Sequence, residues 1–291
     1  MEDNMDTVER RPNSTRAQLE TVEKELDGLT AGTAQERQSS SPGMLSTLLD
    51  TLYSQILDEA FHDFSPNEKG WEVRLRILHT FLCTAERTST SVVADLLFTS
   101  DYNDIVDKLI SYLHAVLYRE HGRVLAYHKS FLDFIFDQDR SGNFWCNQAM
   151  HHQFLANACL RCMKDGLRFN IANIPSSFVL DVDNPMLVDA VEENIPPVLK
   201  YSCRNWSHHV SAATSIIADG LLYNICDFLQ LRALFWIEAM NLLRLRGLCS
   251  SMLQIVHDWV ISSQVSFLSF EYPVTHLLCH LGQLIISRRA K

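Results

Sequence analysis

Apolar residues recur at three- and four-residue spacing along most of the chain, which is the period of an α-helix with one buried face. The first run consists of Leu45, Leu48, Leu49, Leu52, Ile56 and Leu57. After a loop that includes Pro66, a second run consists of Val73, Leu75, Ile77, Leu78, Phe81 and Leu82. The spacing therefore predicts two amphipathic helices in succession.

The next part of the chain changes from helical spacing to two short apolar runs around a turn. The Ser and Thr residues at 88–91 supply N-cap candidates for a helix over 92–97, and Asp101 or Asn103 can cap a helix that extends to Leu113. The runs 115–118 and 123–127 flank a Gly-containing turn, which is typical of a β-hairpin. Helices followed by a hairpin are the layout of a winged helix.

Helical spacing resumes after the hairpin. It predicts helices over 128–136, 147–167, 214–229, 231–246, 248–262 and 273–287, and one more that begins at Pro196-Pro197. The segment 137–143 is predicted as a loop, and 173–194 as a loop or short helices.

The expected fold class is mainly α, with a winged-helix unit and its short β-hairpin followed by an α-helical bundle or arm. We expect a flexible leader or linker over 1–43, a winged-helix-like domain with a preceding helix over 44–137, and the helical arm over 138–291.

The composition of the chain limits which cellular compartment and which classes of partner are expected. The formal net charge of −10 argues against broad binding to nucleic acid or anionic membranes, because phosphate groups need a basic face. The uncharged stretch 272–287 is shorter than the roughly 20 residues that a membrane span needs. The amino-terminal residues lack the apolar region of a secretion signal, and the 8 cysteines are expected to be buried thiols. We therefore expect a cytoplasmic protein with no nucleic-acid and no membrane partner.

The sequence contains no complete pattern for nucleotide binding or catalysis. It has no Gly-Lys dipeptide and no GxGxxG, so neither a P-loop nor a dinucleotide fingerprint is present. The run Phe178–Asp181 resembles a magnesium-binding strand end, but without a phosphate loop it is interpreted as an apolar run ending in a loop aspartate. We expect no catalytic residue, no metal ligand, no cofactor and no enzyme activity.

The cysteine and histidine pairs of the sequence are not interpreted as metal ligands. Cys159 and Cys162 form a lone CxxC in mid-helix, whereas a structural zinc site usually has a second pair. His276 and His280 would share a helix face, and two His-His dipeptides occur at 151–152 and 208–209. None belongs to an HExxH pattern, so the histidines are interpreted as satisfied core or surface residues.

A winged helix also raises the hypothesis of DNA binding. The expected recognition helix offers Asp101, Asp104 and Asp107 against Lys108, which is the wrong sign for a phosphate groove. The hairpin adds only Arg119, His121 and Arg123.

Several longer stretches resemble the winged-helix and helical-arm region of fungal NACHT proteins, which are signalling NTPases of the NOD-like (STAND) type. The winged-helix part is carried by Ala94–Leu97, Asp104–Val116 and Leu125–Ile135, the last containing His-x-Ser-Phe-x-Asp-Phe. The arm is carried by Arg140–Trp145, His151 or His152, Leu155-Ala156, Cys159-Leu160, Leu167–Ile171, Leu199–Trp206 and Leu234–Ala239. The resemblance covers about residues 44–246.

In that family a nucleotide-binding domain precedes the winged helix, and WD-type repeats often follow the arm. The resemblance implies that His128 is the nucleotide-sensing histidine, which reaches the β-phosphate of ADP and holds the closed state. This sequence departs from the family because it contains neither the nucleotide domain nor the repeats.

The resulting hypothesis is a non-catalytic relay or protein-interaction module, similar to a truncated NACHT-type signalling protein without its NTPase domain. Its protein partner is not identified by the sequence. Two alternatives stay open: a winged-helix nucleic-acid-binding protein, and a partial gene product of a full switch NTPase. For packing, Phe131, Phe134 and Trp206 are predicted to be buried.

Overall fold

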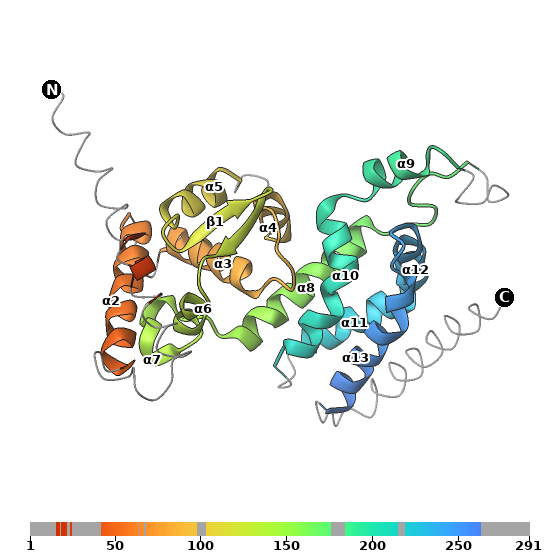
Figure 1. Ribbon diagram of the computed structural model, residues 1–291. Helices are drawn as coiled ribbons and strands as arrows, with labels where there is room; N and C mark the ends of the chain where they lie inside the picture. The colour runs from red at the N-terminus through yellow and green to blue at the C-terminus, as the bar shows by residue number, and fades with distance from the viewer. Residues whose placement is uncertain are drawn as a thin grey trace, which may run out of the picture. The chain divides into compact units, whose positions relative to one another are not determined.

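A computed structural model gives the fold of the chain (Figure 1). It describes residues 42–63, 65–66, 68–97, 103–175, 184–214 and 219–262, together with a few helical positions between 16 and 24. The elements up to the first long helix are α2 (Pro42–Phe61), α3 (Lys69–Cys83), α4 (Thr90–Leu96), α5 (Asn103–Tyr112), β1 (Leu117–Glu120), β2 (Arg123–Ala126), α6 (Lys129–Ile135), α7 (Gln138–Ser141) and the 3-10 helix η2 (Gly142–Phe144). They are followed by α8 (Gln148–Gly166), α9 (Leu187–Asn194), α10 (Pro197–Ala212), α11 (Asp219–Leu231), α12 (Ala233–Leu242), the 3-10 helix η4 (Arg246–Leu248) and α13 (Cys249–Ser262).

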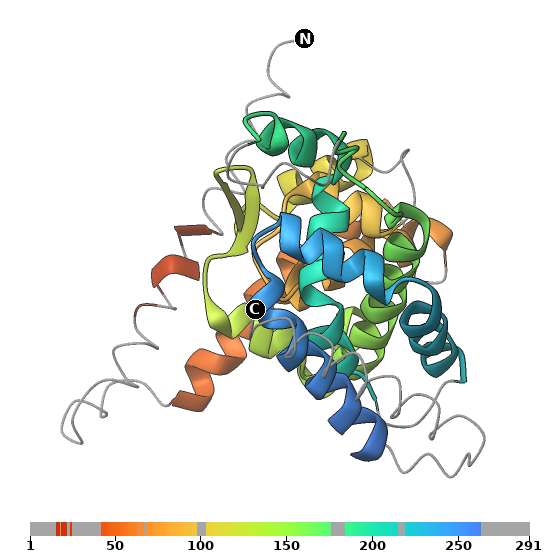
Figure 2. The same ribbon diagram turned by 90° about the vertical axis from the view of Figure 1, so that its right-hand side faces the viewer.

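The described chain is mainly helical and contains one β-hairpin, as the sequence pattern predicts. The strands pair antiparallel, with Leu117 opposite Ala126 and Glu120 opposite Arg123. The turn residues His121 and Gly122 both have positive φ, at 51° and 75°, as a type I′ turn requires. The two strands lie side by side in both views (Figures 1 and 2).

The chain divides into two compact units. The first unit comprises residues 1–94 and 98–147, and the second comprises 95–97 and 148–291. The first unit extends past the expected domain boundary at 137, because α7 and η2 pack against α2 and α3. Arg140 makes a paired contact with the Asp50 carboxylate, with its Nη2 2.6 Å from Oδ1 and its Nε 3.1 Å from Oδ2.

Aromatic side chains fill the core of the first unit. Tyr53 of α2 contacts Phe131 and Phe134 of α6, with ring centroids 5.2 and 5.5 Å apart. A second group joins Phe61, Trp71 and Phe144, whose centroids lie 4.8 to 5.3 Å apart. The predicted burial of Phe131 and Phe134 is confirmed.

The second unit is built around the helix pair α8 and α10, which make the most extensive helix–helix contact there. The end of α8 meets the start of α10, where a Cβ on Gly166 would lie 2.9 Å from a methyl of Leu199, so glycine permits the close approach. Trp206 of α10 is fully buried, as predicted, against Phe228 and Trp236. The indole Nε1 of Trp236 donates to the Cys203 carbonyl oxygen at 2.9 Å.

Most predicted helices are confirmed to within a few residues, and two details are wrong. The pattern predicts that Gly70 belongs to the loop that includes Pro66, but Gly70 lies inside α3. The predicted loop 137–143 contains α7, because the Asp137 carboxylate accepts from the backbone N–H groups of Asp139 and Arg140 and caps a short helix. The predicted helix 273–287 and most of the 1–43 segment lie outside the described residues. Within the described part of the chain, no helix combines the length and the apolar character that a membrane crossing needs.

Candidate functional site

His128 lies at the junction between β2 and α6. Its backbone is extended, with φ −137° and ψ 146°, and its ring caps the first turn of α6. The backbone N–H of Ser130 donates to His128 Nδ1 at 3.1 Å. Because a backbone N–H can only donate, Nδ1 carries no proton, and the neutral ring holds its proton on Nε2.

A chain of hydroxyl groups connects this junction to α2. Ser130 Oγ lies 2.6 Å from His128 Nδ1 and 2.6 Å from the hydroxyl of Tyr53. Since Nδ1 is an acceptor, the Ser130 hydroxyl donates to it and accepts from Tyr53. Tyr53 is fully buried, so the His128 ring is anchored to the core of the first unit.

This Ser–His contact is local, because the two residues are two positions apart and the His128 ring caps the helix that carries Ser130. The one lone pair of His128 Nδ1 accepts from both the hydroxyl and the backbone N–H of Ser130. The same hydroxyl accepts from Tyr53, which fixes its orientation. The geometry therefore fits a capping and anchoring role for His128.

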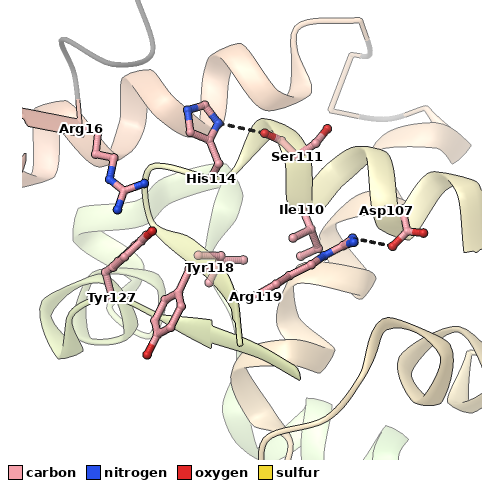
Figure 3. A pocket seen from close by; sticks show the side chains of 9 residues that line it. Arg16, Asp107, Ile110, Ser111, His114, Tyr118, Arg119 and Tyr127 are labelled. Atoms are coloured by element: carbon pink, nitrogen blue, oxygen red, sulfur yellow. Dashed lines mark hydrogen bonds and ion pairs between the residues drawn. The ribbon is translucent and has the colours of Figure 1, made fainter. Parts of the chain in front are cut away.

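A shallow pocket of about 440 Å³ lies beside the hairpin (Figure 3). On one side the Arg16 guanidinium lies over the Tyr127 ring, 4.3 Å from its centroid, and Tyr127 in turn contacts Tyr118. On the other side Arg119 Nη2 donates to the Asp107 carboxylate, as the dashed line in Figure 3 marks. The Asp107 ion pair compensates the charge of Arg119, so the pocket presents an aromatic and mixed-charge surface.

Helix α5 carries the acidic residues that the sequence places on the expected recognition helix. Asp104 lies in its first turn, and Asp107 pairs with Arg119 of β1. Lys108, the basic residue of α5, has its Nζ 5.8 Å from the centre of the Tyr112 ring. Asp101 lies outside the described residues.

The cysteines of the described chain are free thiols, and all but the half-buried Cys162 are buried. Burial raises the pKa of the Cys162 thiol to about 11 and also raises that of Cys159. Within the described ranges, neither thiol belongs to a group of three or more close His, Cys, Asp or Glu ligand atoms. Cys279, His276, His280 and Asp181 lie outside those ranges.

One histidine of the 151–152 pair meets both histidines of the 208–209 pair in the second unit. The ligand atoms of His152 from α8 and of His208 and His209 from α10 all lie within 4.8 Å of one another. We call these three residues the histidine cluster. His152 Nδ1 is 2.9 Å from His209 Nδ1, and Tyr201 Oη is 2.8 Å from His209 Nε2. Burial, with a smaller contribution from neighbouring histidines, lowers the pKa of His152 to about 4 and that of His209 to about 2.

The sequence gives both His-His dipeptides but does not join them. One signal could have joined them. His152 lies near the start of the predicted helix 147–167, and residues 208–209 lie well into the predicted helix that begins at Pro196-Pro197. If those helices pack antiparallel, the two positions become neighbours, which is the arrangement in the structure.

No protein-family model matches the chain, and neither the curated proteins nor the solved structures contain a significant match to it.

Proposed function

We propose that the protein is a non-catalytic relay that binds a protein partner through the hairpin of its first unit and acts without bound nucleotide. In this proposal the first unit is a winged helix, the second unit is the helical arm of a NACHT-like protein, and the protein works in the cytoplasm. The order of helices and hairpin supports this, together with the sequence resemblance around His128.

One observation carries the relay part of the proposal. The hydrogen bonds from Tyr53 through Ser130 to His128 connect the buried face of α2 to the residue that joins β2 and α6. If a partner displaces the hairpin, these hydrogen bonds break or become strained. The displacement is then transmitted to α2 through Tyr53. Burial of Tyr53 between Phe131 and Phe134 makes this connection stiff.

The partner surface in this proposal is the pocket beside the hairpin. Tyr127 is 39% exposed while it supports the Arg16 guanidinium, so an aromatic ring and a cation are both presented to solvent. Tyrosine and arginine are, with tryptophan, enriched at the centres of protein interfaces.

Hydrogen exchange tests the connection. Tyr53→Phe removes the hydroxyl and keeps the ring, so exchange at the amides of Val124 to Ala126 should become faster. The matched control is Tyr112→Phe on α5, which leaves the Tyr53–Ser130–His128 chain intact and should leave those amides unchanged. If the amides of Val124 to Ala126 exchange at the same rate in Tyr53→Phe and Tyr112→Phe, the relay proposal is wrong.

Affinity capture from cytosol tests the surface. We expect that the wild type and Lys129→Ala retain a partner and that Tyr127→Ala loses it. Lys129 is the control because it is exposed and adjacent to the junction. Retention of the same proteins by Tyr127→Ala would place the partner surface elsewhere.

A further inference from the structure

The histidine cluster lies where the helix pair of the second unit places three imidazoles against one another. His152 comes from the amino-terminal part of α8, and His208 and His209 come from the last turns of α10. The ring centroids of His152 are 5.6 Å from His208 and 5.2 Å from His209, and those of His208 and His209 are 5.4 Å apart. All three residues belong to the same compact unit.

The nitrogen atoms of the three rings lie close enough for one metal ion to reach them after small ring rotations. Two imidazole nitrogens that each lie about 2.0–2.1 Å from a tetrahedral zinc ion are about 3.3 Å apart. His152 Nδ1 and His209 Nδ1 share a hydrogen bond at 2.9 Å, so zinc binding requires the proton of this bond to leave Nδ1 and a small rotation of either ring to open the gap. His208 is exposed, so its ring can turn to complete the set without disturbing the core.

The surroundings of His209 fix the orientation of its ring, as is usual for a histidine that binds a metal ion. A ligating histidine usually forms a hydrogen bond through its second nitrogen, which fixes the tautomer and the ring orientation. The Tyr201 hydroxyl, which is buried, lies 2.8 Å from His209 Nε2. With the proton on Nε2 and donated to Tyr201, the lone pair of Nδ1 is directed at His152 and accepts the His152 Nδ1 proton, which a metal ion would replace.

The donor set selects the class of metal. Imidazole nitrogen is the ligand that zinc and its neighbours copper and nickel prefer, whereas calcium and magnesium require oxygen ligands. We propose that His152, His208 and His209 bind one Zn²⁺ ion through three nitrogen atoms, with Tyr201 positioning His209. The fourth ligand on the exposed side of His208 is water. The ion bridges α8 and α10, and its binding therefore stabilises the second unit.

Zinc titration of the full chain, first treated with a chelator, tests the site by calorimetry. We expect one saturable Zn²⁺ equivalent that His208→Ala abolishes or weakens by more than 100-fold. Tyr201→Phe keeps all three ligands and removes the positioning hydroxyl, so its zinc affinity should fall by roughly 10- to 100-fold. His257→Ala is the control, because it removes a histidine of the second unit that contacts Asp258 and not the cluster.

Co²⁺ gives an independent readout. The visible ligand-field absorption of Co²⁺ reports a tetrahedral nitrogen site. We expect this absorption in the wild type and in His257→Ala, and we expect none in His208→Ala. His208 is exposed, so its substitution is expected to leave the fold intact, and the circular dichroism spectrum checks this. Zinc affinity and Co²⁺ absorption that are equal in wild type and His208→Ala would overturn the proposal, as would the lack of saturable zinc binding by the wild type.

Discussion

The hydroxyl groups of Tyr53 and Ser130 lie 2.6 Å apart although 77 residues separate them in sequence. This bond links α2 to the first turn of α6. The Ser130 hydroxyl is also bonded to His128 Nδ1, which accepts from the backbone N–H of Ser130 as well. The junction between hairpin and helix is therefore anchored in the core and not only at the surface.

The first prediction concerns the stability that this bond provides. Tyr53→Phe should lower the free energy of unfolding by about 1 kcal/mol, which is typical of one buried hydrogen bond. Tyr223→Phe is the control, because Tyr223 is 60% exposed. Urea denaturation monitored by circular dichroism gives both values, and a loss for Tyr53→Phe no larger than that of the control would mean that the bond adds no stability.

The second prediction concerns the packing of α6. Phe131 is 1% exposed and contacts the Tyr53 ring edge-on, so Phe131→Ala should cost roughly 3–5 kcal/mol. Phe169→Ala should change stability little, because Phe169 is 79% exposed. If the melting temperature of Phe131→Ala equals that of the wild type, the assignment of the buried face of α6 is wrong.

The third prediction concerns the ion pair between Asp50 and Arg140. The Asp50 carboxylate raises the pKa of Arg140, and about a quarter of each side chain is exposed. A double-mutant cycle with Asp50→Asn and Arg140→Gln should give a coupling energy of about 1 kcal/mol, above the value for a fully exposed pair. A coupling energy near zero would show that the Asp50–Arg140 pair does not help to hold α7 against α2.

The fourth prediction concerns pH. His79 is buried and its Nε2 donates to the Phe144 carbonyl oxygen at 3.0 Å. Burial lowers its pKa from 6.5 to about 4, although the hydrogen bond opposes this. Because the pKa of His79 is lower in the folded state than in the unfolded state, the free energy of unfolding has its full value above pH 6.5. It decreases as the pH falls toward 4. The loss amounts to about 3 kcal/mol, at roughly 1.4 kcal/mol for each unit of pKa shift.

His79→Gln tests this origin of acid sensitivity. Glutamine keeps an N–H donor and does not titrate, so the fall in stability between pH 6.5 and 4 should become shallower than in the wild type. His152 and His209 contribute in the same direction, so some dependence remains. Identical pH profiles for wild type and variant would show that His79 is not responsible.

Local patterns in the sequence predict the helices and the hairpin well, and long-range contacts less well. The spacing of apolar residues locates α2, α3 and α10, because each helix buries one face. The turn at His121 and Gly122 is also visible, since a glycine stands where positive φ is required. The helix α7 does not follow from the pattern of apolar residues, because Asp137 caps it through backbone groups within a polar segment.

The candidate site depends on contacts that no local pattern shows. The sequence motif identifies His128, but the bond to Tyr53 depends on how α2 packs on α6. The histidine cluster likewise requires that α8 and α10 pair antiparallel, which places His152 beside residues 208 and 209. Helix pairing is a tertiary property, so neither contact could be derived from spacing.

The central claim is that this chain acts through its hairpin and helices without bound nucleotide. Titration of the purified full chain with ADP and with ATP in the presence of Mg²⁺, followed by calorimetry, tests it most directly. We expect no saturable binding by the wild type or by His128→Ala. Micromolar affinity for ADP in the wild type that is lost in His128→Ala would contradict the claim, and would make His128 a nucleotide sensor within this chain.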